Sequence, residues 1–299
     1  MNEDVSYIKG ILWMLLTTIF FVLVTAIVKY IGSDIPSAQA AFIRYVIGTL
    51  ILFPFIVPII NKNFGKQNII IFSLRGLAHG LAVMLWFYAI SRIPIAEVTA
   101  ISYTAPIFIS IGAAIFFGEK FASRRIIAII FAFVGTLIIL RPGFNQISTG
   151  QIAQILTAPL FAISFLLTKK LSETMSSIVI VCMLSVYVTL ILMPAAIIVW
   201  VHPAINDIIG LSIVAILATL GHLTLTQAIK TAPLTFTQPI SYLQLIWATL
   251  IGFYFFSEKI DLFVLMGGGI IISSVTYISF REIKLNSFHK TTLSNYTKN

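Results

Sequence analysis

The chain has 299 residues, of which 59% are hydrophobic and only 10% are charged, and it carries a formal net charge of +9. A soluble globule of this length does not need so much apolar surface, and its exterior would not dissolve in water. The composition therefore excludes an ordinary soluble enzyme or binding protein and favours a chain that is surrounded by lipid.

Long apolar runs follow one another along the chain, and each has about the 20 residues that an α-helix needs to cross a bilayer. We expect ten spans, near residues 10–31, 38–60, 70–91, 94–117, 122–140, 149–171, 176–200, 209–230, 233–256 and 260–281. Membrane-barrel strands are excluded because the runs are about twice as long as such strands and do not alternate. The expected fold is an all-α integral membrane protein with ten transmembrane helices.

The chain contains one unit twice. Residues 89–120 align without a gap with residues 228–259, and both stretches hold a proline, an Ile-Ser-Tyr and a final Phe-Phe-x-Glu-Lys. Since each copy has an odd number of helices, five, the second copy enters the membrane upside down relative to the first. We expect inverted five-helix repeats at residues 1–141 and 149–282, followed by a polar cytoplasmic tail at residues 283–299.

The positive charges indicate a topology and not a nucleic-acid partner, because they flank helices instead of clustering on one face. Apart from Arg44, which lies within a span, fourteen Lys and Arg residues fall on one side of the expected membrane and four on the other. Loops that are rich in Lys and Arg stay in the cytoplasm. We therefore expect a multi-pass protein of the inner (plasma) membrane with both termini in the cytoplasm.

The spans near 94–117 and 233–256 keep the same polar face in both copies. On a helical wheel this face holds Thr99, Ser102 and Tyr103 in the first copy and Gln238, Ser241 and Tyr242 in the second. Pro106 and Pro239 interrupt the two helices, and the freed carbonyl groups need protein or water partners. Two interpretations stay open, since small and hydroxyl residues pack helices closely in lipid and also offer hydrogen bonds to a substrate in a cavity.

Histidines within the spans are further candidates, because ionisable groups are costly in lipid and tend to face cavities. His79 shares one stripe with Arg75 and Trp86, and His222 lies on the related face of the equivalent helix in the second copy. Each histidine would bind substrate or carry a proton, or would form a structural hydrogen bond to a carbonyl group. The histidines have no metal-ligand spacing, so no cofactor is expected.

Arg44 lies about two turns into the second span, where an arginine near the helix centre costs roughly 2.5–3.5 kcal/mol by insertion scales. It would pair with a carboxylate or phosphate of a substrate, with a structural partner, or with the outer headgroups by snorkelling. Glu97 falls on the face opposite Tyr103, and its place in the first turn of a helix is explained by the helix dipole.

The sequence resembles the EamA-type proteins of the drug/metabolite transporter superfamily. Tyr88-Ala-Ile-x-x-Ile-Pro and Phe117-Gly-Glu-Lys are similar to motifs of the first repeat of that family, and Ala228-Ile-x-x-x-Pro and Phe256-Ser-Glu-Lys to those of the second. The resemblance covers nearly the whole chain and implies a transporter with ten helices, of which the first, third, fourth, sixth, eighth and ninth surround a central cavity.

Two features distinguish the chain within that resemblance. Many relatives carry Glu-Pro in the middle of the fourth and ninth helices, where this chain has Ala105-Pro106 and Gln244-Leu245, so proton coupling through those carboxylates is not implied. The stretch 242–246, Tyr-Leu-Gln-Leu-Ile, is similar to that region in bacterial S-adenosylmethionine uptake carriers of the superfamily.

The resulting hypothesis is a secondary transporter that moves a small organic metabolite by alternating access through a cavity between the repeats. Its partners would be the substrate and the lipid bilayer, with proton coupling left open and no nucleic acid. The expected substrate contacts are Arg44, His79, Trp86, Thr99, Ser102, Tyr103, His222, Gln238, Ser241, Tyr242 and Trp247. The alternatives are an S-adenosylmethionine uptake carrier and, in another class, a channel or structural subunit. No catalytic residues are expected, because no nucleophile–base–acid set is present.

Overall fold

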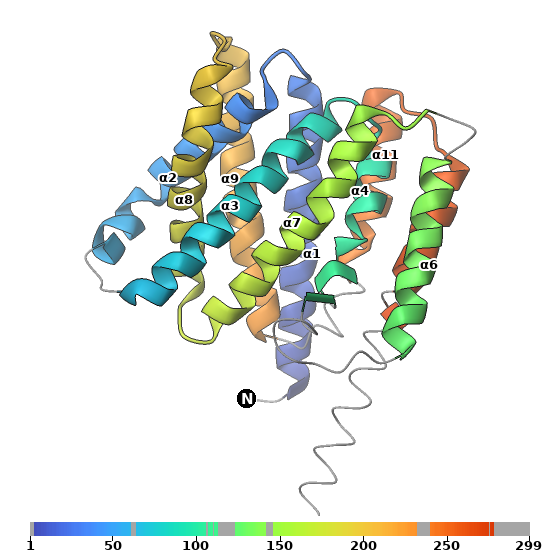
Figure 1. The fold of residues 1–299 in the computed structure, drawn as a ribbon, viewed down its shortest axis with the longest axis horizontal. Coiled ribbons are helices and arrows are strands. Elements are labelled where there is room, and N and C mark those ends of the chain that lie inside the picture. Colours follow the sequence, from blue (N-terminus) through green and yellow to red (C-terminus); the bar gives the residue numbers. More distant parts are fainter. Residues whose placement is uncertain are drawn as a thin grey trace, which may run out of the picture.

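The computed structural model describes residues 3–60, 64–105, 107–109, 111–112, 123–141, 146–231, 240–274 and 276–277. Every regular element among these residues is a helix (Figure 1). The labelled helices are α1 (Glu3–Ile31), α2 (Ser37–Ile60), α3 (Gly65–Ile90), α4 (Ile95–Ser102), α6 (Ser123–Leu140), α7 (Thr149–Ser172), α8 (Ser177–Ile198), α9 (Ile205–Thr231) and α11 (Leu243–Phe256). A further apolar helix, Leu262–Ser274, follows α11.

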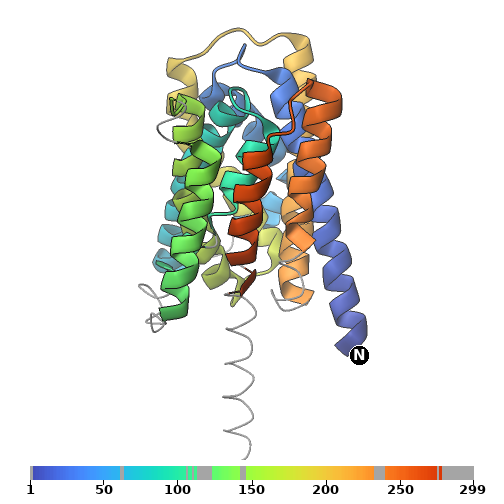
Figure 2. The same cartoon turned by 90° about the vertical axis from the view of Figure 1, so that its right-hand side faces the viewer.

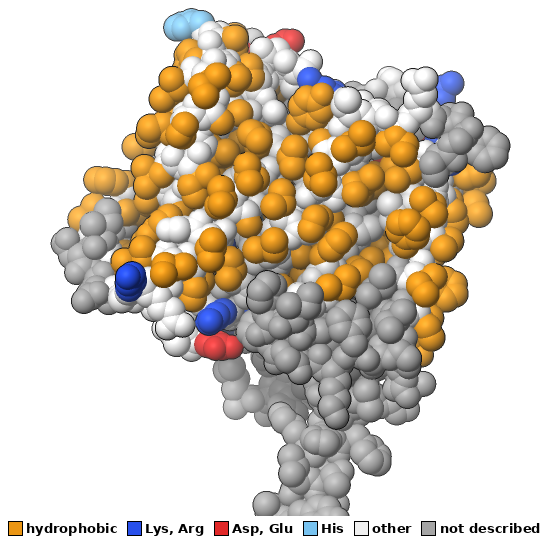
Figure 3. Space-filling view, viewed as in Figure 1, with side chains coloured by type: hydrophobic (Ala, Val, Ile, Leu, Met, Phe, Trp, Pro, Cys, Tyr) orange, Lys and Arg blue, Asp and Glu red, His pale blue; other side chains and the backbone are white. Residues whose placement is uncertain are grey.

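Most of the long helices have the length and the apolar composition of membrane-spanning helices. Among the described residues, six of them (α1, α2, α3, α7, α8 and α9) are long and apolar enough to cross a bilayer. Hydrophobic side chains cover the middle of the face seen in Figure 3, and charged side chains lie near its upper and lower edges. Because lipid solvates apolar side chains only across the hydrocarbon thickness, this distribution confirms the predicted all-helical membrane protein.

Helices from the two halves of the chain pack against each other in a regular pattern. The main pairs are α1 with α9, α3 with α7, and α2 with α8, and α4 lies against α11. In Figure 1, α3 and α7 run beside each other across the front of the bundle. In the two copies, α7, α8, α9 and α11 are the counterparts of α1, α2, α3 and α4. If each helix is replaced by its counterpart, the α1–α9 pair becomes the α7–α3 pair, and the α2–α8 and α4–α11 pairs stay the same.

One end of the bundle is defined by the short connection between α3 and α4. Lys29, in the last turn of α1, donates a hydrogen bond of 2.8 Å to the carbonyl oxygen of Ile93 in this connection. Gly150, in the first turn of α7, packs so closely on Ile93 that an added methyl group would lie 2.9 Å from its side chain. Because α1 ends and α7 begins at this end, called here the Lys29 end, the two helices run in opposite directions.

The fourth predicted span is broken where the sequence indicates a break. Helix α4 ends at Ser102, and Tyr103 and Thr104 adopt turns. Pro106 has no amide proton for the carbonyl group of Ser102, and its ring clashes with that carbonyl in a continuous helix. In the second copy, α11 begins at Leu243 directly after Tyr242, which also lies in a turn.

Two glycines allow close contact between α6 and the Leu262–Ser274 helix, which lie next to each other in Figure 2. A methyl group added to Gly135 would lie 2.7 Å from the carbonyl oxygen of Gly267, and one added to Gly267 would lie 2.5 Å from that of Gly135. Small residues bring helices together in this way in lipid, where no hydrophobic force acts between them. Gly267 therefore has a packing role.

Candidate substrate-binding cavity

A cavity of about 500 Å³ lies inside the bundle and is lined by residues of both halves of the chain. Helix α7 contributes residues from Phe161 to Ser172, and α9 contributes residues from Ala218 to Lys230. Both helices begin at the Lys29 end, since Gly210 in the first turns of α9 packs on Ile31. The cavity therefore extends from the middle of the bundle toward the opposite end, called here the Lys169 end.

Two histidines lie in edge contact in the wall of the cavity. The ring centroids of His79 and His222 are 5.5 Å apart, and each ring meets the edge or face of a phenylalanine, Phe161 at 5.3 Å from His79 and Phe21 at 5.3 Å from His222. Phe21 and Phe161 occupy equivalent positions in the two copies when residues 10–29 are aligned with residues 150–169. Nδ1 of His79 lies 3.1 Å from Oγ of Ser164. Its Nε2 is buried and has no hydrogen-bond partner among the described residues.

Two arginines also line the cavity and are almost fully buried. Arg44 is 6% exposed, and its guanidinium group lies 3.9 Å from the ring centroid of Tyr45. Arg75 is 5% exposed and donates a hydrogen bond of 2.8 Å from Nη1 to the carbonyl oxygen of Ile180. Its Nε has no hydrogen-bond partner in the described part of the chain.

Five of the eleven predicted contacts line this cavity, namely Arg44, His79, Trp86, Ser102 and His222. The stripe of Arg75, His79 and Trp86 on α3 faces it, as the spacing indicates. Ser102 is held in place by Gln154 of α7, which donates a hydrogen bond of 2.8 Å to its hydroxyl oxygen.

The structure places four other predicted contacts in a seam between α4 and α11. The rings of Tyr103 and Tyr242 meet edge to face at 5.1 Å, and the Tyr103 hydroxyl donates to the carbonyl oxygens of Ser241 and Tyr242 at 3.3 Å each. Thr99 donates to the carbonyl oxygen of Ile95 in its own helix. The Ser-Tyr face that both copies share thus joins the two broken helices, which is the packing interpretation, and these residues do not line the cavity.

The two remaining predicted contacts lie elsewhere. Trp247 is 36% exposed on the outer surface of α11 and does not line the cavity. Gln238 lies outside the described residues.

Several lining residues were not predicted, chiefly Tyr45, Phe161 and Gln244. Gln244 stands where many EamA-type relatives have glutamate, and this difference in the sequence could have identified it as a lining residue. Phe161 repeats Phe21 in the other copy. Tyr45 gave no signal, because an aromatic residue on an apolar helix usually belongs to a packed core. Helices α2 and α8 also contribute to the lining, beyond those that the family resemblance implies.

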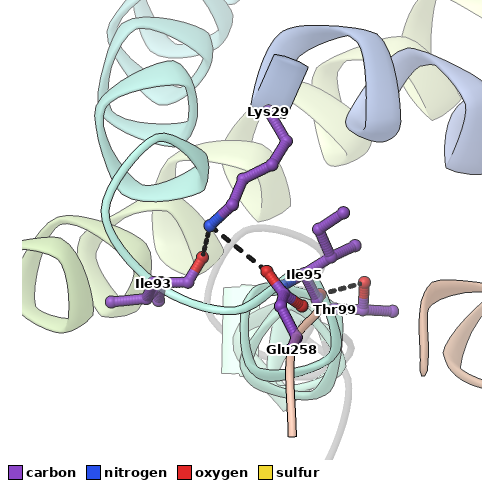
Figure 4. Close-up of polar contacts among 5 residues, drawn as sticks. All are labelled: Lys29, Ile93, Ile95, Thr99 and Glu258. Atoms are coloured by element: carbon purple, nitrogen blue, oxygen red, sulfur yellow. Dashed lines mark hydrogen bonds and ion pairs between the residues drawn. The ribbon is translucent and has the colours of Figure 1, made fainter. Parts of the chain in front are cut away.

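A polar contact links three elements at the Lys29 end of the bundle (Figure 4). Nζ of Lys29 lies 3.3 Å from a carboxylate oxygen of Glu258, and the second oxygen accepts a hydrogen bond of 2.9 Å from the backbone amide of Ile95. Glu258 thereby caps the N-terminus of α4, where the helix dipole favours a negative charge. Ser257 adopts the left-handed conformation, with φ of 53°, and ends α11 just before Glu258. One contact thus joins α1, α4 and the end of α11.

The described residues hold no group of three or more His, Cys, Asp or Glu side chains that could bind a metal ion. Glu97 accepts a hydrogen bond of 2.5 Å from the side-chain amide of Gln151, near the Lys29 end, and lies apart from the cavity. The lining offers hydrogen-bond donors, cations and aromatic faces, which suit binding of an organic molecule.

Comparisons with known proteins agree with this arrangement. The model of the EamA-like transporter family matches residues 8–141 and again residues 148–280. The chain is similar to an S-adenosylmethionine uptake transporter of Rickettsia bellii, with 28% identity over 96% of this chain and 99% of the relative. It is also similar to a pseudopaline exporter of Pseudomonas aeruginosa (25% identity; 91% of this chain and 96% of the relative).

A riboflavin transporter of Vibrio cholerae is 27% identical over 93% of this chain and 95% of its own length. A solved crystal structure that is 12% identical superposes with a TM-score of 0.63 over 95% of this chain and 99% of its own, and has the same fold. The family and the names of the relatives indicate a transporter and not an enzyme. The chain belongs to the EamA-like transporter family and is a small-molecule membrane transporter.

Proposed function

We propose that the chain is a secondary carrier of the inner membrane that moves a small organic metabolite by alternating access through the cavity between two inverted repeats. The observation that carries the proposal is the asymmetry of the cavity. It extends toward the Lys169 end, whereas the contact between Lys29 and Glu258 closes the other end. A carrier needs such a one-sided state, and a channel does not.

The helix directions support the inverted repeat. Helix α1 and its counterpart α7 run in opposite directions, because α1 ends and α7 begins beside Ile93. The same holds for α3 and its counterpart α9, since α3 ends at the Lys29 end and α9 begins there. Helix pairs that map onto each other when the copies are exchanged are expected for two repeats related by an axis in the membrane plane.

The repeat also suggests how the opposite end closes. Lys169 and Glu119 occupy the positions in the sequence that correspond to Lys29 and Glu258 in the other copy. Glu119 lies outside the described residues. We assign the pair Lys29 and Glu258 to one end of the transport path and the pair Lys169 and Glu119 to the other, so that each pair has one member in each repeat. Rocking of one repeat against the other would then open one end as the other closes.

The charge distribution of the sequence supports a cytoplasmic Lys169 end and cytoplasmic termini. In that orientation the cavity faces inward. His79 and His222 are the groups in the cavity through which a proton could be coupled to transport. The proposed substrate contacts are Arg44, Arg75, His79, Trp86, Ser102, His222 and Gln244.

A second, narrower candidate is uptake of S-adenosylmethionine. It is favoured by similarity over nearly the full length to an S-adenosylmethionine uptake transporter, at 28% identity. Direct uptake of labelled S-adenosylmethionine into vesicles that contain the protein tests this candidate.

Side-specific labelling of a cysteine in the cavity tests alternating access without knowledge of the substrate. In S102C the thiol lies in the cavity wall, and the natural Cys182 is buried. In inside-out vesicles, an impermeant maleimide should label S102C readily. In right-side-out vesicles, labelling should be slow and should become faster in S102C/E258Q. Equal labelling from both sides in S102C would indicate a channel and would contradict the proposal.

A further inference from the structure

We propose that the substrate is an organic anion with an aromatic or other planar apolar body, whose carboxylate or phosphate is bound by Arg44 and Arg75. This inference deepens the proposed function, because it takes the cavity as the substrate site. It rests on the charge and burial of the lining residues and not on the similarity to any relative.

The described wall of the cavity holds buried positive charge and no carboxylate. Arg44 and Arg75 line it, and none of its described lining residues is Asp or Glu. The two arginines are 6% and 5% exposed. Arginine stays protonated in proteins, so neither side chain can lose its charge to relieve the cost of burial.

Three described acidic side chains are engaged near the Lys29 end. Glu258 pairs with Lys29 and caps α4. Asp261 pairs with Arg141, and Glu97 accepts a hydrogen bond from Gln151. No described carboxylate forms an ion pair with Arg44 or Arg75. A buried charge without a counter-charge is unfavourable, and a bound anion supplies the missing partner.

Two buried polar atoms without a partner fit this role. Nε of Arg75, a donor, and Nε2 of His79, a donor in the tautomer whose Nδ1 accepts from Ser164, have no hydrogen-bond partner among the described residues. A guanidinium group presents its donors in a planar fork that matches two oxygens of a carboxylate or phosphate. The donors therefore match an oxyanion in charge and in shape.

Arg44 differs in its solvent exposure from another arginine of the chain that also stacks on a tyrosine. Arg92 also lies over a neighbouring tyrosine ring, with 3.6 Å between its guanidinium carbon and the ring centroid of Tyr88. Arg92 is exposed, so water solvates its charge. Arg44 has the same kind of contact with Tyr45 but is buried in the cavity wall. The tyrosine ring alone does not replace the lost hydration of a full charge.

The rest of the wall indicates the body of the ligand. Phe21, Tyr45, Trp86, Phe87, Phe161 and Phe165 contribute aromatic faces to the lining. Rings of this kind hold planar apolar groups by stacking and edge contacts. The expected ligand thus places an oxyanion at the arginines and a planar body among the aromatic rings.

Matched ligands test the sign of the charge. We would measure thermal stabilisation of the purified protein by indole-3-acetate, indole-3-acetamide and tryptamine, which share a ring, and by flavin mononucleotide and riboflavin. At least one anion should bind at least about tenfold more tightly than its neutral or cationic analogue, the factor that one charge-assisted hydrogen bond supplies. The inference is overturned if neither anion binds more tightly than its neutral and cationic analogues, or if no anion stabilises the protein.

Variants test whether the preference for the anion depends on Arg44 and Arg75. R44Q and R75Q should lose the preference for the anion, whereas R92Q, which removes a stacked arginine outside the cavity, should keep it. R44K and R75K retain the charge without the fork and should bind the anion with intermediate affinity, which guards against a folding defect in the Gln variants. An anion preference that survives in both R44Q and R75Q overturns the assignment.

Counterflow separates this inference from the proposed function. If unlabelled S-adenosylmethionine inside vesicles accelerates its own uptake and no anion binds, the chain is a carrier and the anion inference is wrong. If anions bind with the predicted charge preference but never exchange across the membrane, the site is correct and the carrier proposal is wrong.

Discussion

The contact between Lys29 and Glu258, which we propose closes the Lys29 end, offers the sharpest perturbation of the proposed transport cycle. In E258Q the side chain keeps its shape but loses its charge, so the ion pair with Lys29 and the charged cap on the amide of Ile95 are both weakened. The side chains of Lys29 and Glu258 are 18% and 12% exposed, so solvent screens the pair only partly.

A hydrogen bond to a charged group contributes about 1.5–3 kcal/mol, and a charge at a helix N-terminus about 0.3–1 kcal/mol. Since glutamine retains a weaker hydrogen bond, we expect E258Q to destabilise the closed state by about 2 kcal/mol. A difference of about 1.4 kcal/mol is a factor of ten, so the ratio of open to closed protein at this end should rise about 30-fold.

Spin labels report this shift as a distance. Tyr30 and Tyr254 are exposed near the ends of α1 and α11 and can be replaced by labelled cysteines. E258Q should add a population with a longer distance, and K29Q in the same background should add little more, because its partner is already neutral. K259Q, which neutralises an exposed neighbouring charge, is the control. Identical distance distributions for E258Q and the unmodified protein would refute the role of this contact.

Three further predictions follow from local geometry. S257G should raise the thermal stability by about 1 kcal/mol, because Ser257 has φ of 53° and the equivalent position of the first copy is glycine; an unchanged or lower Tm would contradict this. G135A should lower the free energy of unfolding by about 1–3 kcal/mol, because the added methyl group forces α6 away from Gly267. G269A, with nothing within 4 Å of the added carbon, should leave the stability unchanged or raise it in the same thermal melting experiment. W86A should reduce ligand binding and W247A should not, since only Trp86 lines the cavity; equal losses in a binding assay would show that the cavity is not the site.

The helices could be predicted closely from the sequence because their length is set by the bilayer. The spans expected at 38–60 and 149–171 are α2 (Ser37–Ile60) and α7 (Thr149–Ser172) in the structure. The fourth span could not be outlined from hydropathy alone, because its apolar run continues through Pro106 while α4 ends at Ser102. Backbone chemistry, and not apolar content, ends that helix.

Arg44, the two histidines, Trp86 and Ser102 were also predicted as parts of the cavity, whereas Tyr45, Phe161 and Gln244 were not. His79, His222 and Arg44 stand out in an apolar sequence because lipid tolerates such groups only where something faces them. The helical wheel did indicate the shared polar face of Tyr103 and Tyr242, but a wheel does not show what that face contacts. Whether such a face meets another helix or a cavity depends on packing across the repeats, and here it meets the other helix.

Counterflow in vesicles distinguishes an alternating-access carrier for an organic anion from a channel. The measurement is uptake of the tightest-binding labelled anion with and without the same unlabelled anion inside the vesicles, for the unmodified protein and for R75Q. We predict that internal anion accelerates uptake and that R75Q abolishes the acceleration. Uptake that does not respond to internal anion would indicate a channel, and uptake that R75Q leaves unchanged would place the substrate site elsewhere.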